Sequence, residues 1–195
     1  KNGSYLEPDE WVFKIDMDVT PAWWTLAHKR ACEREHKKWV KELDKVLVRK
    51  PIVHPFHITP PEKITDEHIQ LVREWDSVRA SVWDSVWDSV WDSVGDSVGD
   101  SVGRSVWASV GASVRDSVWD SVWASVGASV GAYNGTFFLL KRSAWKYTEN
   151  IPGEGYPFQP AVTLWEMGLV PSFDGRTWRL HGGPDGRVLW EGVIR

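Results

Sequence analysis

The chain has 195 residues, which is long enough for one large domain or two small ones with a hydrophobic core, and its formal net charge is −4. The acidic balance excludes a strongly basic nucleic-acid-binding surface, and no apolar run reaches the roughly 18 residues of a membrane span. Residues 1–10 are polar, so no signal peptide is expected, and the single cysteine, Cys32, fits a reducing compartment. These features predict a cytoplasmic protein with no membrane partner, and they argue against nucleic acid as a partner.

The first region, residues 1–74, is predicted to combine one strand, two helices and a connector. Apolar and polar residues alternate over 11–19, and Thr20-Pro21 has the form of a helix start. Four prolines in 51–61 indicate extended backbone, and Thr65 is placed to cap a helix. The expected elements are a strand over 11–19, a long charged helix over 21–48, a connector over 51–61 and a short helix over 66–74.

A tetrapeptide repeat occupies residues 75–132. Its unit is x-[Asp/Ala]-Ser-Val, and the Ser-Val pair recurs fourteen times, from Ser77-Val78 to Ser129-Val130. The x slot holds seven Trp, six Gly and two Arg, and the second slot holds eight Asp, six Ala and Arg104. Tyr133-Asn134-Gly135 then breaks the frame. The repeat therefore has two constant and two variable positions.

A four-residue period argues against one long α-helix. Each residue turns about 100°, so the valine position advances about 40° per repeat and winds more than once around the axis. Val, Ser, Asp and Gly also have low helix propensity. The constant valine instead suits the inward position of a stacked β-solenoid. The x slot is expected to face outward, because a close-packed interior does not tolerate Trp and Gly in equivalent places.

A four-sided coil of sixteen residues orders the x slot better than a three-sided coil of twelve. It gives one column of tryptophans, namely Trp75, Trp91, Trp107 and Trp123. A longer duplicated unit would produce the same column, so both coil lengths stay open. The predicted fold class is mainly β: a short four-sided β-solenoid over 75–132, flanked by an α-containing N-terminal region and a small α+β C-terminal cap.

The C-terminal cap, residues 133–195, is predicted from turn and helix signals. Pro160 can start a helix that Gly168 ends, and Gly182-Gly183-Pro184-Asp185-Gly186 forms a hairpin turn. The expected elements are a strand over 136–140, a helix over 160–168, and strands over 177–181 and 187–191.

The four-sided arrangement is similar to the right-handed quadrilateral β-helix of pentapeptide-repeat proteins, which have a period of five and a central Leu or Phe. The run itself, as in Trp83-Asp84-Ser85-Val86, followed by Ala132-Tyr133-Asn134-Gly135-Thr136-Phe137-Phe138, resembles uncharacterised bacterial and phage tetrapeptide-repeat proteins. That resemblance covers residues 75–138 and implies no established activity. Some pentapeptide-repeat proteins mimic DNA and bind topoisomerases, and the repeat here is acidic. An acidic DNA-mimic inhibitor is therefore one alternative function.

Metal ligands have weak candidates in His28, Cys32 and His36, which recur at i, i+4 and i+8 on the predicted long helix. A fourth ligand, His54 or His57, would have to come from the connector, and a partly buried cysteine beside two surface histidines explains the pattern better than a metal site does. The sequence has no glycine-rich phosphate loop and no nucleophile motif. We therefore predict no catalytic residue, metal or cofactor, with a metal-dependent enzyme in the flanking regions as an alternative.

The predicted function is that of a non-catalytic binding or scaffolding protein that displays a grid of Trp, Arg and Asp. Exposed aromatic patches commonly mark interfaces, and the expected partner is another protein or a second copy of the chain. Rows of Trp could instead stack on sugar rings, as in a carbohydrate-binding module. The flanking regions could also cover these tryptophans. The predicted binding surface comprises Trp75, Trp83, Trp87, Trp91, Trp107, Trp119, Trp123, Arg79 and Arg115.

Overall fold

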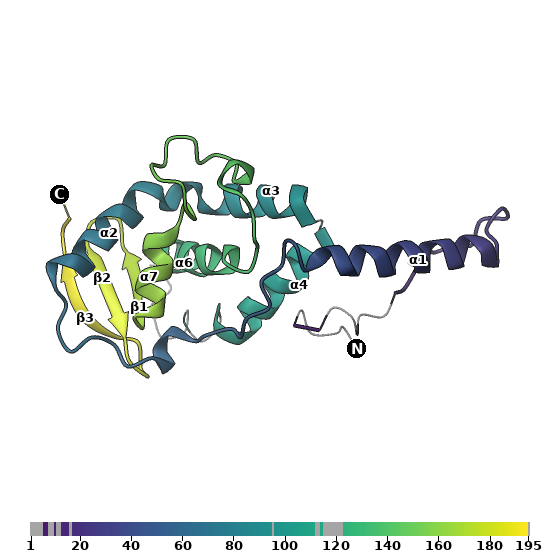
Figure 1. Cartoon of the computed structure of the whole chain (residues 1–195). Coiled ribbons are helices and arrows are strands. Elements are labelled where there is room, and N and C mark those ends of the chain that lie inside the picture. Colours follow the sequence, from purple (N-terminus) through teal and green to yellow (C-terminus); the bar gives the residue numbers. More distant parts are fainter. Residues whose placement is uncertain are drawn as a thin grey trace.

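The tetrapeptide repeat is helical where the structure describes it, so the predicted mainly β fold and its four-sided β-solenoid are wrong (Figure 1). The computed structural model describes residues 6–7, 10, 13–15, 17–94, 96–111, 114 and 123–194, with the backbone alone at 96–97 and 123–125. The repeats form the end of α2 (Asp66–Val78), all of α3 (Val82–Val94) and α4 (Asp96–Val106), and most of α6 (Trp123–Gly135). A short 3₁₀ turn, η3 (Arg79–Ser81), separates α2 from α3, and a π-helical turn, η4 (Trp107–Gly111), follows α4.

Because the helices of the repeat are short, a four-residue period still keeps the valines of each helix on one face. Three steps of about 40° rotate the valine stripe of α3 by about 120°, which is the width of an ordinary apolar helix face. α4 then packs against α3 and begins a new stripe. The valines of both stripes are buried: Val82, Val86, Val90, Val94, Val98, Val102 and Val106. The inward position of valine was predicted correctly, but the secondary structure that presents it was not.

α6 lies at the centre of the fold and packs against α3, α4, α7 (Gln159–Glu166) and β1 (Leu169–Phe173) (Figure 1). The second slot of its repeats holds Ala128 and Ala132, which are both buried. In α3 the same slot holds aspartates, and Asp84 and Asp92 are exposed. A helix that is covered on all sides must be apolar all round. Alanine in the second slot of α6 therefore allows this helix to be covered on all sides.

Glycine in the x slot makes room for a side chain of the neighbouring helix. A Cβ on Gly127 would lie 3.3 Å from Trp83 Cζ2, and one on Gly131 would lie 3.2 Å from Val82 Cγ1. A Cβ on Gly99 would lie 3.1 Å from Trp91 Cδ1. Trp and Gly are thus complementary across helix–helix contacts. The expectation that every x residue faces outward fails at Gly127 and Gly131, which are buried.

The C-terminal region is a three-stranded antiparallel sheet in the order β1-β2-β3, which packs against α6 and α7 through β1. β2 (Trp178–Gly182) and β3 (Arg187–Gly192) form the hairpin that was predicted, to within a residue or so at each end. β1 was not predicted. The strand expected over 136–140 is replaced by a single bridge, in which Phe138 pairs with Leu47, which lies between the observed end of the first long helix and the connector.

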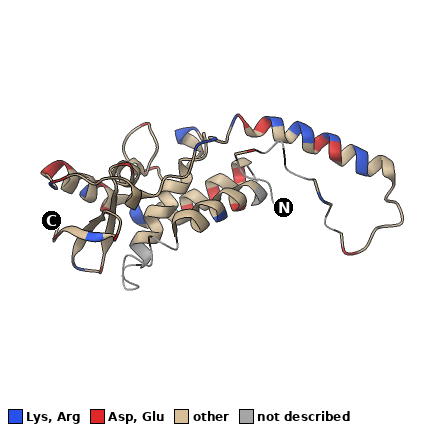
Figure 2. Ribbon diagram, turned by 90° about the horizontal axis from the view of Figure 1, so that it is seen from below, with Lys and Arg blue, Asp and Glu red and all other residues tan. Residues whose placement is uncertain are grey.

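The N-terminal region supplies a helix that projects from the body, α1 (Leu26–Leu43) (Figure 1). Lysine, arginine and acidic side chains alternate along it (Figure 2), and it buries only Val40 and Leu43, near its C-terminal end. It begins five residues later than predicted, because the backbone N–H of Thr25 donates to His28 Nδ1 at 3.0 Å and caps it there. Residues 13–15 and 17–19 form no strand, and the rest of the expected strand lies outside the described residues.

α2 begins at Asp66, as predicted, and the same capping contact joins the Thr65 N–H to His68 Nδ1 at 3.0 Å. The connector before it contains a single 3₁₀ turn, η2 (Pro55–His57). None of the described helices is both long enough and apolar enough to cross a bilayer.

Replacing Gly103 with alanine is expected to raise the free energy of unfolding by about 0.5–1 kcal/mol, because alanine is the better residue inside a helix. The new Cβ would meet only Asn134 Nδ2, at 3.8 Å. Gly111→Ala is the contrasting variant, since its Cβ would lie 1.8 Å from Trp107 Cε3 and must displace that ring. Urea denaturation followed by circular dichroism measures both. Equal effects of the two variants would contradict this packing.

Candidate ligand-binding site

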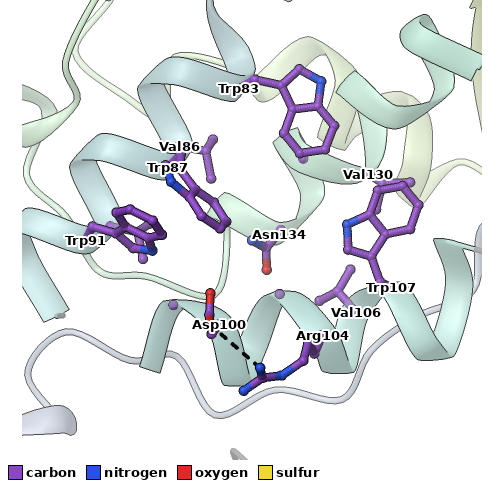
Figure 3. A pocket seen from close by; sticks show the side chains of 14 residues that line it. Trp83, Val86, Trp87, Trp91, Asp100, Arg104, Val106, Trp107, Val130 and Asn134 are labelled. Carbon is purple, nitrogen blue, oxygen red and sulfur yellow. Dashed lines mark ion pairs between the residues drawn. The ribbon is translucent and has the colours of Figure 1, made fainter. Parts of the chain in front are cut away.

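A pocket of about 290 Å³ opens between α3, α4, η4 and α6 (Figure 3). α3 provides three tryptophans, η4 provides a fourth, and glycines of α4 and α6 form part of the remaining wall. The residues that carry the argument below are Trp83, Trp87, Trp91, Asp100, Gly103, Arg104, Trp107 and Asn134. A concave, mostly apolar site with a few polar groups is the usual form of a small-molecule site, and this volume is near the lower end of the usual range.

The four indoles are arranged as two pairs. Trp83 and Trp107 are parallel to within 4°, with ring centroids 6.4 Å apart. Trp87 and Trp91 are in closer contact, at 4.1 Å and 47°. Trp83 and Trp87 remain 43% and 46% exposed, so the pocket is open to solvent along α3. Indole rings held in this way offer flat apolar faces to a ligand that enters.

Two residues that line this pocket each have a buried polar atom with no hydrogen-bond partner within the part of the chain that the structure describes. These atoms are the indole Nε1 of Trp91, a donor, and the side-chain Oδ1 of Asn134, an acceptor. The Asn134 side chain lies in the space between the indoles of α3 and helix α4 (Figure 3). An unpaired buried polar group costs about 1–3 kcal/mol. These two atoms therefore lower the stability of the fold beside the pocket.

The position of Asn134 within the repeat frame is informative. Ser129-Val130 is the last regular pair, so residue 134 occupies the next valine position. A polar residue thus replaces the inward valine at the point where the repeat ends. Sequence reasoning treated Tyr133-Asn134-Gly135 only as a break in the frame and missed this signal.

An ion pair lies at the rim of the pocket, where Arg104 Nη1 is 3.7 Å from Asp100 Oδ2 (Figure 3). The Arg104 side chain is 70% exposed and that of Asp100 is 41% exposed, so solvent screens the pair. The rim is therefore close to neutral. Arg104 is also the one basic residue in the second slot of the repeat.

The predicted binding residues divide into four groups. Trp83, Trp87, Trp91 and Trp107 come together in the pocket, although they were expected on the outer faces of a solenoid. Trp75 is fully buried in the core, so it presents no binding surface. Arg79 lies over the rings of Phe173 and Trp178, at 5.0 and 5.6 Å from their centroids, and ties η3 to the sheet. Arg115, Trp119 and the side chain of Trp123 lie outside the described residues.

The aspartates of α3 are partly covered by the segment that follows η6 (Arg142–Ala144). The hydroxyl of Tyr147 donates to Asp88 Oδ2 at 2.8 Å, and Lys146 forms an ion pair with Asp92. The Lys146 backbone N–H also donates to Ser89 Oγ at 2.8 Å. These contacts interrupt the row of aspartates that the DNA-mimic alternative requires.

The candidate metal ligands on α1 have other contacts. His28 Nδ1 accepts the capping hydrogen bond of Thr25, and the His36 ring lies 5.2 Å from that of Phe13 and 5.9 Å from that of Trp39. Cys32 is half-buried with a free thiol. Within the described part of the chain, no three His, Cys, Asp or Glu side chains are grouped as a metal site requires.

A serine–histidine contact in the sheet was not foreseen. Ser172 Oγ lies 2.7 Å from His181 Nε2, and His181 Nδ1 lies 2.9 Å from the Gly186 carbonyl. The Nδ1–H of His181 therefore donates a hydrogen bond to the Gly186 carbonyl, and its Nε2 accepts a hydrogen bond from the Ser172 hydroxyl. Ser172 is fully buried and His181 is 6% exposed. The pair is closed to a substrate and joins β1, β2 and the hairpin turn.

His181 is expected to make stability depend on pH. Burial lowers the pKa of its imidazole, helped by the nearby Arg179 charge, so protonation favours the unfolded chain. The contribution of neutral His181 is complete above the unfolded pKa of roughly 6.5 and is lost as the pH falls below it. The free energy of unfolding of His181→Gln should therefore change less between pH 7.5 and 5.5 than that of the wild type. Equal changes would show that His181 does not titrate in this way.

Comparison with known proteins finds no match among family models, curated proteins or solved structures.

Proposed function

We propose that this chain is a non-catalytic binding protein whose binding site is the tryptophan-lined pocket between α3, α4, η4 and α6. The observation that carries the proposal is the convergence of four indoles on one concavity. Large apolar pockets with a few convergent polar groups are where proteins bind small ligands.

The packing of the repeat supports the same conclusion. A fold that needed these helices only for stability would fill the gap between them, because voids in a core lower stability. Here Gly103 of α4 lines the gap and leaves it open, since a Cβ at this position would meet only Asn134 Nδ2, at 3.8 Å. The π-helical turn that begins at Trp107 adds to the case, since such turns are frequent at functional sites.

The test compares ligand binding by the wild type and by two pocket variants. Trp83→Ala/Trp107→Ala removes the parallel pair, and Gly103→Leu places a side chain in the pocket from a position where a Cβ fits. Trp23→Ala is the matched control, because Trp23 is 65% exposed and does not line the pocket. Saturation-transfer NMR against a library of aromatic, cationic and carbohydrate compounds identifies binders.

We expect compounds that bind the wild type and Trp23→Ala, and that lose at least tenfold in affinity for both pocket variants. Circular dichroism at 222 nm checks that the variants stay helical. Binding that is unchanged in both pocket variants would place the site elsewhere. A wild type that is oligomeric by light scattering, with monomeric pocket variants, would instead identify the pocket as a contact between copies.

A further inference from the structure

The outer end of α1 carries exposed apolar side chains. The segment before α1 lies at the end of the helix that is farthest from the body (Figure 1). Val19 is 79% exposed, Trp23 is 65% exposed and Leu26 is 61% exposed, and we call these three residues the apolar tip. Apolar surface exposed together in one place is typical of a site that contacts another molecule or a membrane.

The apolar tip is held in a defined geometry. The Trp24 N–H donates to the Pro21 carbonyl at 2.9 Å, and the Thr25 N–H donates to His28 Nδ1 at 3.0 Å. The Trp24 ring stacks on that of His28, with centroids 5.7 Å apart, and the Trp23 ring meets the same imidazole edge-on at 5.5 Å. These contacts fix the backbone on both sides of Trp23, so its exposure does not come from a frayed helix end.

One face of α1 is basic. Six of its 18 residues are Lys or Arg and three are Glu, whereas the whole chain has a net charge of −4 (Figure 2). Arg30, Arg34, Lys37 and Lys41 recur at i, i+4, i+7 and i+11, so they share one face, which we call the basic stripe. All four are exposed, and none forms an ion pair with another described residue. Leu26 lies four residues before Arg30, so the basic stripe begins at the apolar tip.

The rest of α1 leaves the basic stripe free. Glu35 and Glu42 each pair with a lysine outside the stripe. The half-buried His36 packs on the opposite face, with its ring 5.2 Å from that of Phe13. The helix has 18 residues and is therefore about 27 Å long, so its outer end lies well beyond the screening length of about 8–10 Å from the acidic repeat.

An anionic lipid surface matches both features. Trp side chains favour the interface between headgroups and acyl chains, aliphatic side chains leave water there, and Lys and Arg are attracted to anionic headgroups. We propose that α1 docks on the surface of an anionic bilayer, with the apolar tip inserted among the headgroups and the basic stripe facing the lipid charges. The contact is peripheral and needs no spanning helix. The prediction of no membrane partner rested on the lack of a long apolar run, which concerns spanning segments alone.

A nucleic acid fits the outer end of α1 less well. It would pair with the same cations. However, it has no apolar phase to take up the aliphatic side chains of Val19 and Leu26, which are the most exposed part of the tip together with Trp23. A bilayer offers negative charge and an apolar interior side by side, in the order in which α1 presents its cations and its tip.

The electrostatic part is tested by co-sedimentation with vesicles of phosphatidylcholine alone and of equal parts phosphatidylcholine and phosphatidylglycerol. Arg30→Gln/Arg34→Gln removes the two cations of the stripe nearest the apolar tip. Lys63→Gln/Arg187→Gln is the matched control, because it removes two exposed cations that lie outside α1. We expect a loss of about 25-fold in affinity for the anionic vesicles in the first variant, at roughly fivefold for each cation beside the surface, and little change in the second.

The apolar part is tested with Trp23→Ala/Leu26→Ala on the same vesicles. Leu139→Ala/Val193→Ala is its control, since both residues are exposed apolar side chains away from α1. The tip variant should lose at least about tenfold in affinity, because two large side chains no longer leave water on binding. Its remaining binding should still weaken with added salt, whereas the arginine variant should lose most of its salt dependence. Circular dichroism at 222 nm checks that all variants keep their helices.

Other results would overturn the inference. Equal binding of the wild type to neutral and anionic vesicles, or equal losses in a variant and its control, would show that the outer end of α1 does not read an anionic surface. Binding of a duplex DNA or RNA oligonucleotide that depends on Arg30 and Arg34, without binding of vesicles, would identify a nucleic acid as the partner instead. None of the substituted residues lines the tryptophan pocket, so these outcomes are independent of the proposed function.

Discussion

Replacing Trp165 with alanine is expected to lower the free energy of unfolding by about 4 kcal/mol, at the upper end of the range for buried residues. Trp165 is fully buried in α7, and its ring stacks on that of Tyr133 in α6, with centroids 4.8 Å apart. Its Nε1–H donates to the Val53 carbonyl at 2.9 Å, and the Val53 N–H donates to the Tyr133 hydroxyl at 2.8 Å. The side chain thus joins the connector, α6 and α7, and its loss leaves a cavity where the three meet.

Two further variants make this prediction specific. Trp165→Phe keeps a ring against Tyr133 but leaves the Val53 carbonyl without its donor, so we expect a smaller loss of about 1–2 kcal/mol. Trp23→Ala removes an exposed indole and should change stability by less than about 0.5 kcal/mol. Urea denaturation monitored at 222 nm measures all three. A loss below 1 kcal/mol for Trp165→Ala would contradict the described packing.

Val90→Asp is expected to unfold the helical core, with a loss of about 4 kcal/mol or more. Val90 is 3% exposed at the middle of the α3 stripe, and its Cγ1 lies 3.1 Å from where a Cβ on Gly99 would be. α4 therefore covers it. A carboxylate at this position would be buried among apolar groups without a compensating charge, which is among the most destabilising single changes. The signature is loss of helical circular dichroism at neutral pH.

Ser93→Asp is the matched control for Val90→Asp, because it introduces the same residue into the same helix at an exposed position. It lies near the C-terminus of α3, where a negative charge is mildly unfavourable, so a loss below about 1 kcal/mol is expected. Similar losses in the two variants would mean that the valine stripe does not form the core.

The sequence was sufficient to predict which repeat position is buried, but not the secondary structure that buries it. The argument against a helix assumed one continuous rod, over which a rotation of about 40° per repeat disperses the valines. α3 carries only Val82, Val86, Val90 and Val94, and over that length the rotation is harmless. Whether a periodic chain turns back depends on contacts between distant repeats, and a local period carries no information about them.

Some of the residues that line the pocket could be predicted from the sequence. Trp83, Trp87 and Trp91 were singled out, but their surroundings were not, because Gly99 and Gly131 were read as alternatives to Trp at one place in a coil. Their role as partners across a helix contact depends on which helices meet. Asn134 in a valine position was a visible anomaly whose meaning required the fold.

The C-terminal region was also predicted only in part. β2 and β3 were predicted because their hairpin is local and its turn residues are distinctive. β1 was not predicted. It contains Pro171, which is tolerated because β1 lies at the edge of the sheet. The Ser172–His181 contact follows from that pairing and could not be foreseen without it.

The tetrapeptide has a constant valine position and a variable x position, and this difference affects how changes in repeat number alter the protein. A coding tract built from one short unit gains and loses whole units when it is copied, and each event moves all later residues by four positions. The valine position survives such a shift, because every unit supplies one. The match between Trp83 and Gly127, or between Trp91 and Gly99, does not survive it, because the x residue differs from unit to unit. Natural variants that differ in repeat number should therefore keep an inward valine in every unit, while the fit between helices, and with it the shape of the pocket, changes.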